Sequence, residues 1–476
     1  MDDVGREVGR RWGWGRGDEV AGGERQRRLE RNPIGGGEEE EEQFAGGLLW
    51  CPIRPGHNFT YHLNVTGQEG TLWWHAHVSC LRASLHGAFI IRPRHAYPFP
   101  KPDKEIPIVI GEWWSINLAQ LGKNMEDGYY DDTSSATTIN GKLGDLYNCS
   151  GVVEDGLVLD VEPGKTYLLR LLNAALYSEY YVKIAGHQFT VVGADANYVR
   201  PFTTDVVAIG PGETVDALVV ASVIPGKYYM VAVGGQAPKP DIQIPATLSR
   251  ATVRYAIGAG NGDEAAPPVA PEMPDQHDFM VSFNFHGNLS SLNRTGSPQV
   301  PATADESLFV VLRMGSICRQ GRLSCKRSGS KESIIVETMN NVSFQLPAAA
   351  AATPLLEELY YDNRRNGTAG GGGGLDQLYT LPDRPARPFN YTDRALIPWG
   401  PNEAWLEPTL RNTVLVPRLG WAAVRFVADN PGVSYMHCHY ELHVSIGMAA
   451  VFIIEDGPTF ESALPSPPVD FPRCNQ

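Results

Sequence analysis

Two short apolar segments, far apart in the chain, each carry a His-X-His pattern. The first, TLWWHAHVSC, contains His75 and His77. The second, SYMHCHYELHVSIGM, contains His437 and His439 with Cys438 between them. Side chains at positions i and i+2 of a β-strand point to one face, and the residue between them points to the other. Each segment is therefore predicted to be a strand that presents two imidazoles together, with the Cys438 thiol facing the opposite way.

These side chains are typical of a metal site. Imidazole binds copper, zinc or iron, and a thiolate joined by imidazole and a weak thioether marks a blue-copper electron-transfer site. His443 lies five residues after Cys438, and Met448 lies five residues after His443. A single histidine in an apolar strand is usually a hydrogen-bonded core residue, but so regular a set argues against that explanation. A structural zinc site is the next alternative, yet the Cys-X2-Cys pairs common in such sites do not occur here. Copper is the predicted metal.

Composition favours a soluble all-β protein. The 476 residues are enough for two to four domains, and 50 Gly, 36 Pro, 19 Tyr and 10 Trp indicate turn-rich β-structure. A net charge of -14 argues against nucleic acid or an anionic membrane as a partner. No apolar stretch approaches the roughly 20 residues that a membrane span needs.

Changes in composition divide the chain into four predicted parts. Residues 1–46 contain the run EEEEE, mix Arg, Gly and acids without periodicity, and are predicted to be disordered. A short first β-sandwich is expected at 47–98, a second at 105–257 and a third at 276–476. Pro-rich, polar stretches separate them, and turn signals such as Pro-Gly punctuate the strand-like runs.

Two features indicate secretion, and one does not. Two closely spaced cysteines, Cys318 and Cys325, would suit a small disulfide loop. Asn-X-Ser/Thr glycosylation sequons favour a secreted glycoprotein, whereas the first 45 residues contain no apolar signal-peptide core. The eight sequons lie at Asn58, Asn64, Asn148, Asn288, Asn293, Asn341, Asn366 and Asn390.

Longer stretches of the sequence resemble a known family. GTLWWHAHVSCLRASLHGAFIIRP resembles the second copper signature of the plant laccases, and DNPGVSYMHCHYELHVSIGMAAVFIIEDGP resembles their fourth. Segments such as PGKTYLLRLLNAAL, NNVSFQLP and LRNTVLVPRLGWAAVRFVADNPG are also similar to laccase sequence, and the similarity extends from Cys51 to Cys474. The resemblance implies a multicopper oxidase with three cupredoxin-like β-sandwich domains, located in the apoplast and active in lignin or phenolic turnover.

The resemblance also implies a role for each candidate residue. Laccases take single electrons from phenols at a type 1 copper and pass them to a trinuclear cluster of type 2 and type 3 coppers, where O2 is reduced to water. Cys438 and His443 would bind the type 1 copper with Met448 as its weak axial neighbour, and Cys438, His437 and His439 would form the electron-transfer route. The four residues matched to the type 3 pair are His75, His77, His437 and His439.

Two of the four family signatures are missing. Where the first should supply His-X-His-Gly, the chain reads EEEEEQFAGGLLW, and where the third should supply His-Pro-X-His-X-His, it reads RALIPWGPNEAWLEPT. Five of the family's ten histidine positions are therefore filled. The missing five include both type 2 ligands, two of six type 3 ligands and one of two type 1 histidines. The first and third sandwiches are expected to be incomplete for the same reason.

The sequence leaves several alternatives open. The chain is either a degenerate laccase, inactive without its missing ligands, or a translation from which two segments were lost. Met at position 448 is also usual in ascorbate oxidases, so ascorbate is an alternative substrate class to phenols. A non-catalytic copper-binding protein is a further alternative. The resemblance matches His187 to a family position near the substrate pocket. An ordinary buried or surface histidine is the alternative. The resemblance makes a disulfide between Cys51 and Cys474 plausible.

Overall fold

The structure is a computed structural model. Predictions for the disordered segment 1–46 and for the Cys51–Cys474 disulfide fall outside the residues that it describes. The described residues are 67–126, 133–144, 148–149, 152–153, 156–236, 247–255, 266–292, 303–318, 333–344, 354–357, 359–360, 410–416 and 421–467, with single residues 58, 60, 63 and 65.

The first His-X-His segment begins in a short antiparallel pair. Strand β1 (Gly70–His75) pairs with β2 (His86–Ile91), so that His75 lies opposite His86. A 3-10 helix, η2 (Ser79–Ala83), connects the two strands. The run TLWW is half or fully buried along β1, as expected for aromatic and branched residues on a pleated surface.

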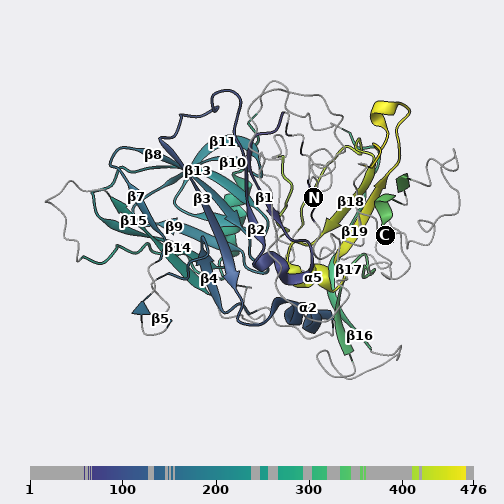
Figure 1. Cartoon of the computed structure of the whole chain (residues 1–476), viewed down its shortest axis with the longest axis horizontal. Helices are drawn as coiled ribbons and strands as arrows, with labels where there is room; N and C mark the ends of the chain where they lie inside the picture. Colours follow the sequence, from purple (N-terminus) through teal and green to yellow (C-terminus); the bar gives the residue numbers. More distant parts are fainter. Residues whose placement is uncertain are drawn as a thin grey trace.

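The region after it is a sandwich of two sheets, which form the blue and teal part of Figure 1. Its six-stranded sheet contains, in spatial order, β11 (Asn197–Thr204), β10 (Phe189–Ala194), β13 (Thr214–Val220), β8 (Thr166–Asn173), β3 (Lys104–Trp113) and β4 (Ala136–Ile139). Its five-stranded sheet contains β12 (Val207–Ile209), β9 (Tyr180–Ile184), β14 (Lys227–Gly234), β15 (Leu248–Tyr255) and β7 (Val158–Val161). A further short pair is β5 (Asn148–Cys149) with β6 (Val152–Val153).

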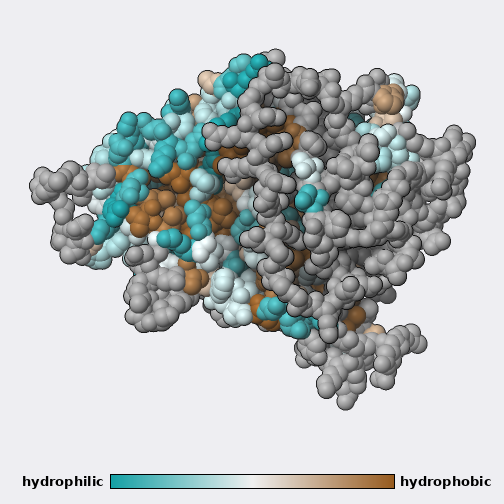
Figure 2. Space-filling model, viewed as in Figure 1, coloured by the Kyte–Doolittle hydropathy of each residue, from teal (hydrophilic) through white to brown (hydrophobic). Residues whose placement is uncertain are grey.

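The main apolar core lies between these two sheets. Strands such as β8 and β13 are buried along almost their whole length, which explains why TYLLRLLN and TVDALVV are nearly continuous apolar runs. Figure 2 shows hydrophobic side chains between the sheets and hydrophilic side chains around them. This core is the rigid base against which the smaller first region packs, because β1 contacts both β8 and β13.

The second His-X-His segment lies at the end of another antiparallel pair. Strand β18 (Gly432–His437) pairs with β19 (Ala449–Ile454), and the short helix α5 (Glu441–Ser445) lies between them. The remaining elements are β16 (Leu312–Cys318), its partner β17 (Ser333–Met339), α2 (Leu118–Glu126), α3 (Phe279–Gly287) and η6 (Phe460–Ser462). Strands far outnumber helices in the described chain, so the all-β prediction is confirmed.

Contacts around α5 join the second His-X-His segment to elements much earlier in the chain. Helix α5 contacts α2 and η2, and Glu441 N donates to Leu176 O at 3.0 Å. Figure 1 shows α5 beside η2, at the foot of the β18–β19 pair. Cys318 is disulfide-bonded; the predicted partner, Cys325, lies outside the described residues. No helix in the described part of the chain is long and apolar enough to cross a membrane.

Candidate metal centre

The two His-X-His segments meet and form one cluster of four imidazoles. His75 and His77 have ring centroids 5.7 Å apart, and the rings of His437 and His439 lie at the same separation. Across the segments, His77 lies 5.1 Å from His437, and His75 lies 5.5 Å from His439. Only the first histidine of each pair belongs to a strand, but the two rings of each pair still share one side, as the alternation predicts. We call these residues the four-histidine cluster.

Hydrogen bonds fix the proton position in two of the rings. Nδ1 of His75 lies 2.9 Å from Ala76 O, and Nδ1 of His437 lies 2.9 Å from Cys438 O. Because a carbonyl oxygen only accepts, each Nδ1 carries the proton and each Nε2 keeps its lone pair. A metal-binding histidine is normally held in this way.

Burial keeps the cluster neutral. It lowers the pKa of His75 and of His439 well below 6.5, and the Arg82 charge adds to the effect. For His437, burial and then the His77 ring lower the pKa to about 3. Neutral imidazole is the form that binds metals, so His75 and His437, which keep their Nε2 lone pairs, are in the form that accepts a cation at ordinary pH.

Arg82 is a buried cation that sequence reasoning missed. Its Nη1 lies 3.0 Å from Nδ1 of His439, and its Nη2 donates to His439 O at 2.9 Å and to two further carbonyls. It also pairs with Glu441 at 3.4 Å. Since a guanidinium only donates, Nδ1 of His439 accepts and the ring proton lies on Nε2. His439 is thus held in the opposite tautomer from His75 and His437.

Trp73 and Gly212 lie beside the imidazole ring of His439. The indole Nε1 donates to Gly212 O at 2.9 Å, and the Trp73 ring lies 5.7 Å from that of His439. A Cβ on Gly212 would lie 2.8 Å from the His439 ring, and the residue has φ +90. The Pro-Gly turn signal predicts a glycine-dependent turn here, but nothing in the sequence predicts the close approach to His439.

Cys438 faces away from the four-histidine cluster towards His443. Its Sγ lies 3.3 Å from Nδ1 of His443, and its amide donates to Met448 O at 3.0 Å. Met448 and Cys438 belong to one apolar cluster with Met339. Burial raises the pKa of the Cys438 thiol to about 12 and lowers that of His443 to about 4. The thiol therefore needs a bound cation to ionise.

A buried carboxyl group, also missed at the sequence level, lies on the other side of His443. Glu337 on β17 is 1% exposed, and its Oε1 lies 3.7 Å from Nε2 of His443. Neither carboxyl oxygen has a hydrogen-bond partner within the described part of the chain. Burial raises the pKa of Glu337 to about 8.

The residues fit copper in part. Nε2 of His77 and Nε2 of His437 lie 3.4 Å apart, the separation expected for two nitrogens bound at about 2.0–2.1 Å to one tetrahedral ion. Cys438 and His443 form a second, sulfur–nitrogen pair. No group of three or more described His, Cys, Asp and Glu side chains is arranged to hold a metal ion. In the described ranges the donors are thus organised in pairs, and each pair lacks a third strong ligand there.

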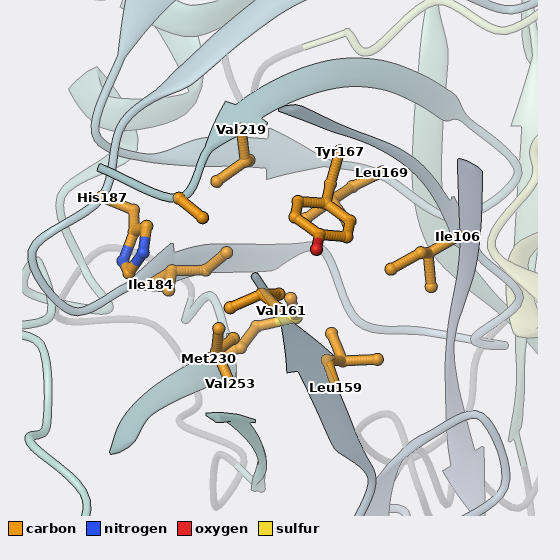
Figure 3. Close-up of a pocket in the computed structure, with 11 residues that line it drawn as sticks. Ile106, Leu159, Val161, Tyr167, Leu169, Ile184, His187, Val219, Met230 and Val253 are labelled. Carbon is orange, nitrogen blue, oxygen red and sulfur yellow. The ribbon is translucent and has the colours of Figure 1, made fainter. Parts of the chain in front are cut away.

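His187 lies apart from these groups. It is buried between the two sheets, where its ring nitrogens lie 2.7 Å from Tyr255 Oη and from Ala185 O. It lines a small apolar cavity of about 20 Å³ with residues such as Tyr167 and Val219 (Figure 3). Its contacts explain it as a hydrogen-bonded core residue of the sandwich.

Three sequence profiles of one family match the chain. All three are described as multicopper oxidase, and they match residues 37–96, 104–255 and 383–458. Curated relatives from rice are close in sequence. Laccase-15 of Oryza sativa subsp. japonica is 54% identical, with 88% of this chain and 80% of that protein covered. Laccase-19 of the same subspecies is 48% identical, with 90% of this chain and 82% of that protein covered.

Solved structures agree in fold. Fet3p, a multicopper oxidase that functions in iron import, superposes with a TM-score of 0.60 at 19% identity, covering 86% of this chain and 76% of that one. The laccase from Botrytis aclada has a TM-score of 0.58 at 20% identity, covering 86% and 74%. The predicted cupredoxin-like fold class is confirmed.

The chain belongs to the multicopper oxidase family. Within that family it is a plant laccase-type oxidoreductase, and the class implies copper as its cofactor. The alignment with rice laccase-15 runs over 492 positions, more than the 476 residues of this chain. Parts of that relative therefore have no counterpart in this chain.

Proposed function

We propose that this laccase-type polypeptide holds copper at two places but does not complete the reduction of O2. One place is the type 1 position, with Cys438, His443 and the weak ligand Met448. The other is the four-histidine cluster, as a type 3 position. His77 and His437 would hold one ion, and His75 with His439 would hold the second once the His439 ring releases Arg82 and frees a nitrogen lone pair. The observation that carries the proposal is the meeting of His77 with His437 and of His75 with His439, each pair without a third ligand among the residues that the structure describes.

The chain's own residues support electron transfer between the two places. Copper, when bound, supplies one-electron redox chemistry. The Cys438 thiol and the rings of His437 and His439 belong to three consecutive residues, so a short covalent path joins the two sites. Desolvation raises the pKa of the thiol and lowers the pKa of His437, which keeps both groups neutral without a metal. Small phenols are the proposed electron donors and O2 the acceptor of the complete reaction. Both type 2 ligands of that reaction are missing from this chain.

Further properties follow from the same resemblance. We propose domain boundaries at 47–98, 105–257 and 276–476, and secretion to the apoplast with a role in lignin or phenolic turnover. N-glycans at some of the eight sequons belong to this proposal. Among the sequon asparagines, Asn58, Asn288 and Asn341 are exposed, which supports their use. An ascorbate oxidase-like preference is the second candidate, and the buried Met448 favours it.

The experiment is copper loading of the purified chain, followed by metal analysis and oxygen uptake with 2,6-dimethoxyphenol or ascorbate. We expect bound copper that is lost in part in Cys438→Ser and in part in His437→Ala, with no sustained oxygen uptake. Sustained uptake with the phenol would show a complete laccase, and a strong preference for ascorbate would favour the second candidate. Failure to retain any copper would leave a non-catalytic relative.

A further inference from the structure

Glu337 is a buried acidic group for which ordinary packing gives no reason. Its side chain is 1% exposed, and neither carboxyl oxygen has a hydrogen-bond partner among the described residues. Leaving a buried polar group unpaired is destabilising. Its backbone is firmly placed, because Glu337 N donates to Ile446 O at 2.9 Å. A carboxyl group retained at such a cost points to a partner that binds there.

The imidazole of His443 lies between this carboxyl group and the Cys438 thiol. Its Nε2 is 3.7 Å from Glu337 Oε1, and its Nδ1 is 3.3 Å from Cys438 Sγ. The first distance exceeds a hydrogen bond of about 2.7–3.2 Å by roughly half an ångström, so a small side-chain rotation would close it. The two ring nitrogens therefore face two different functional groups.

We propose that Glu337 is a positioning residue for a metal ion held by Cys438 and His443. Its carboxylate accepts the Nε2–H of His443, which leaves the Nδ1 lone pair directed to the side where Cys438 Sγ lies. A carboxylate behind a metal-binding histidine fixes the tautomer and raises the basicity of the ligand. The inference rests on the proposed function only in taking Cys438 and His443 as metal ligands.

Charge supports the same arrangement. A thiolate, a carboxylate and a divalent cation sum to zero, whereas a buried charge without compensation is costly. The chain lacks the second histidine that the family places at this copper. Glu337 thus supplies negative charge at a site that is short of one strong ligand.

The test is a Co²⁺ titration of the purified, metal-free full-length protein, read from the thiolate-to-cobalt absorption band. Cys438→Ser identifies the band by removing it. In Glu337→Met, which keeps the volume and removes the carboxyl group, we expect Co²⁺ affinity to fall roughly 10-fold to 100-fold. We expect thermal stability to be unchanged or higher, since the unpaired group is gone. Glu337→Gln retains an acceptor oxygen and should bind with intermediate affinity.

Glu112 provides a matched control elsewhere in the interior. Its carboxylate accepts hydrogen bonds from Leu176 N, Ser178 N and Ser178 Oγ, so Glu112→Gln should lose stability and keep Co²⁺ affinity. Unchanged Co²⁺ affinity in Glu337→Met, or a joint fall of affinity and stability, overturns the role of Glu337 but not the proposed metal site. No cobalt band in the parent protein overturns both this role and the proposed metal site at Cys438.

Discussion

At the scale of single residues, the four-histidine cluster depends on one contact that only glycine permits. Gly212 has φ +90, and a Cβ there would meet three atoms of the His439 ring at 2.8 Å. Because Gly212 is buried and the His439 ring lies directly against it, neither moves aside cheaply. We expect Gly212→Ala to lower the free energy of unfolding by about 1–3 kcal/mol and to weaken metal uptake by the cluster.

Gly164 is the matched control for this substitution. It also follows a proline in a turn, has φ +80, and has no atom within 4 Å of an added Cβ. Gly164→Ala therefore carries the backbone strain of a left-handed residue without the clash. Urea unfolding and zinc uptake should be measured for both variants. Equal losses of stability, or zinc uptake by Gly212→Ala at the parental level, would contradict the role given to this contact.

At the scale of elements, a buried ionic group joins α3 to the turn before β13. His286 Nε2 lies 2.9 Å from Glu213 Oε2, and Arg411 pairs with Glu213 and with Asp195. Burial disfavours the charged form of His286, but the Glu213 carboxylate outweighs it and raises the pKa. Burial disfavours ionised Glu213 too, but His286 and Arg411 lower its pKa to about 2.

These shifts predict a pH window for stability. The raised pKa of His286 gives stabilisation that is fully present below pH 6.5 and is lost as the pH rises through the pKa of the folded state. The lowered pKa of Glu213 gives stabilisation that is full above 4.5 and is lost as pH falls towards 2. His286→Gln should therefore lower the free energy of unfolding most between pH 4.5 and pH 6.5, by about 3 kcal/mol. Urea unfolding across pH measures this loss. Lys183→Gln, which breaks the partly exposed pair with Asp205, should cost little. A cost for His286→Gln that does not vary with pH would contradict the assignment.

At the scale of the whole molecule, stability should be concentrated in the sandwich. Strands β8 and β13 are central in the six-stranded sheet and almost wholly buried, whereas β18 and β19 form a two-stranded sheet in the described chain. Local opening costs least where few buried contacts hold an element. Hydrogen exchange should therefore be slowest in β8 and β13 and clearly faster in β18–β19. Similar protection in both places would show that the region around Cys438 is as stable as the sandwich.

The sequence could predict the strands and the ligand types because their patterns are local. Nearly continuous apolar runs such as TVDALVV and TYLLRLLN mark buried strands, and His-X-His places two rings on one side. The count of histidines is also a property of the sequence alone. Arg82, Gly212 and Glu337 could not be predicted, because each matters through contact with a residue at least 100 positions away.

The amino-acid sequence by itself determined the class of fold, the family and the chemical types of the candidate ligands. Strand periodicity and ligand identity are encoded within a few residues, and a ligand that the chain does not contain cannot be supplied by folding. Only the tertiary structure decided that the four imidazoles meet as two pairs, that Arg82 fixes the tautomer of His439, and that a carboxyl group lies behind His443. These features depend on how β1, η2, α5 and β17 pack together, since burial and distance between remote side chains set their charge and proton positions.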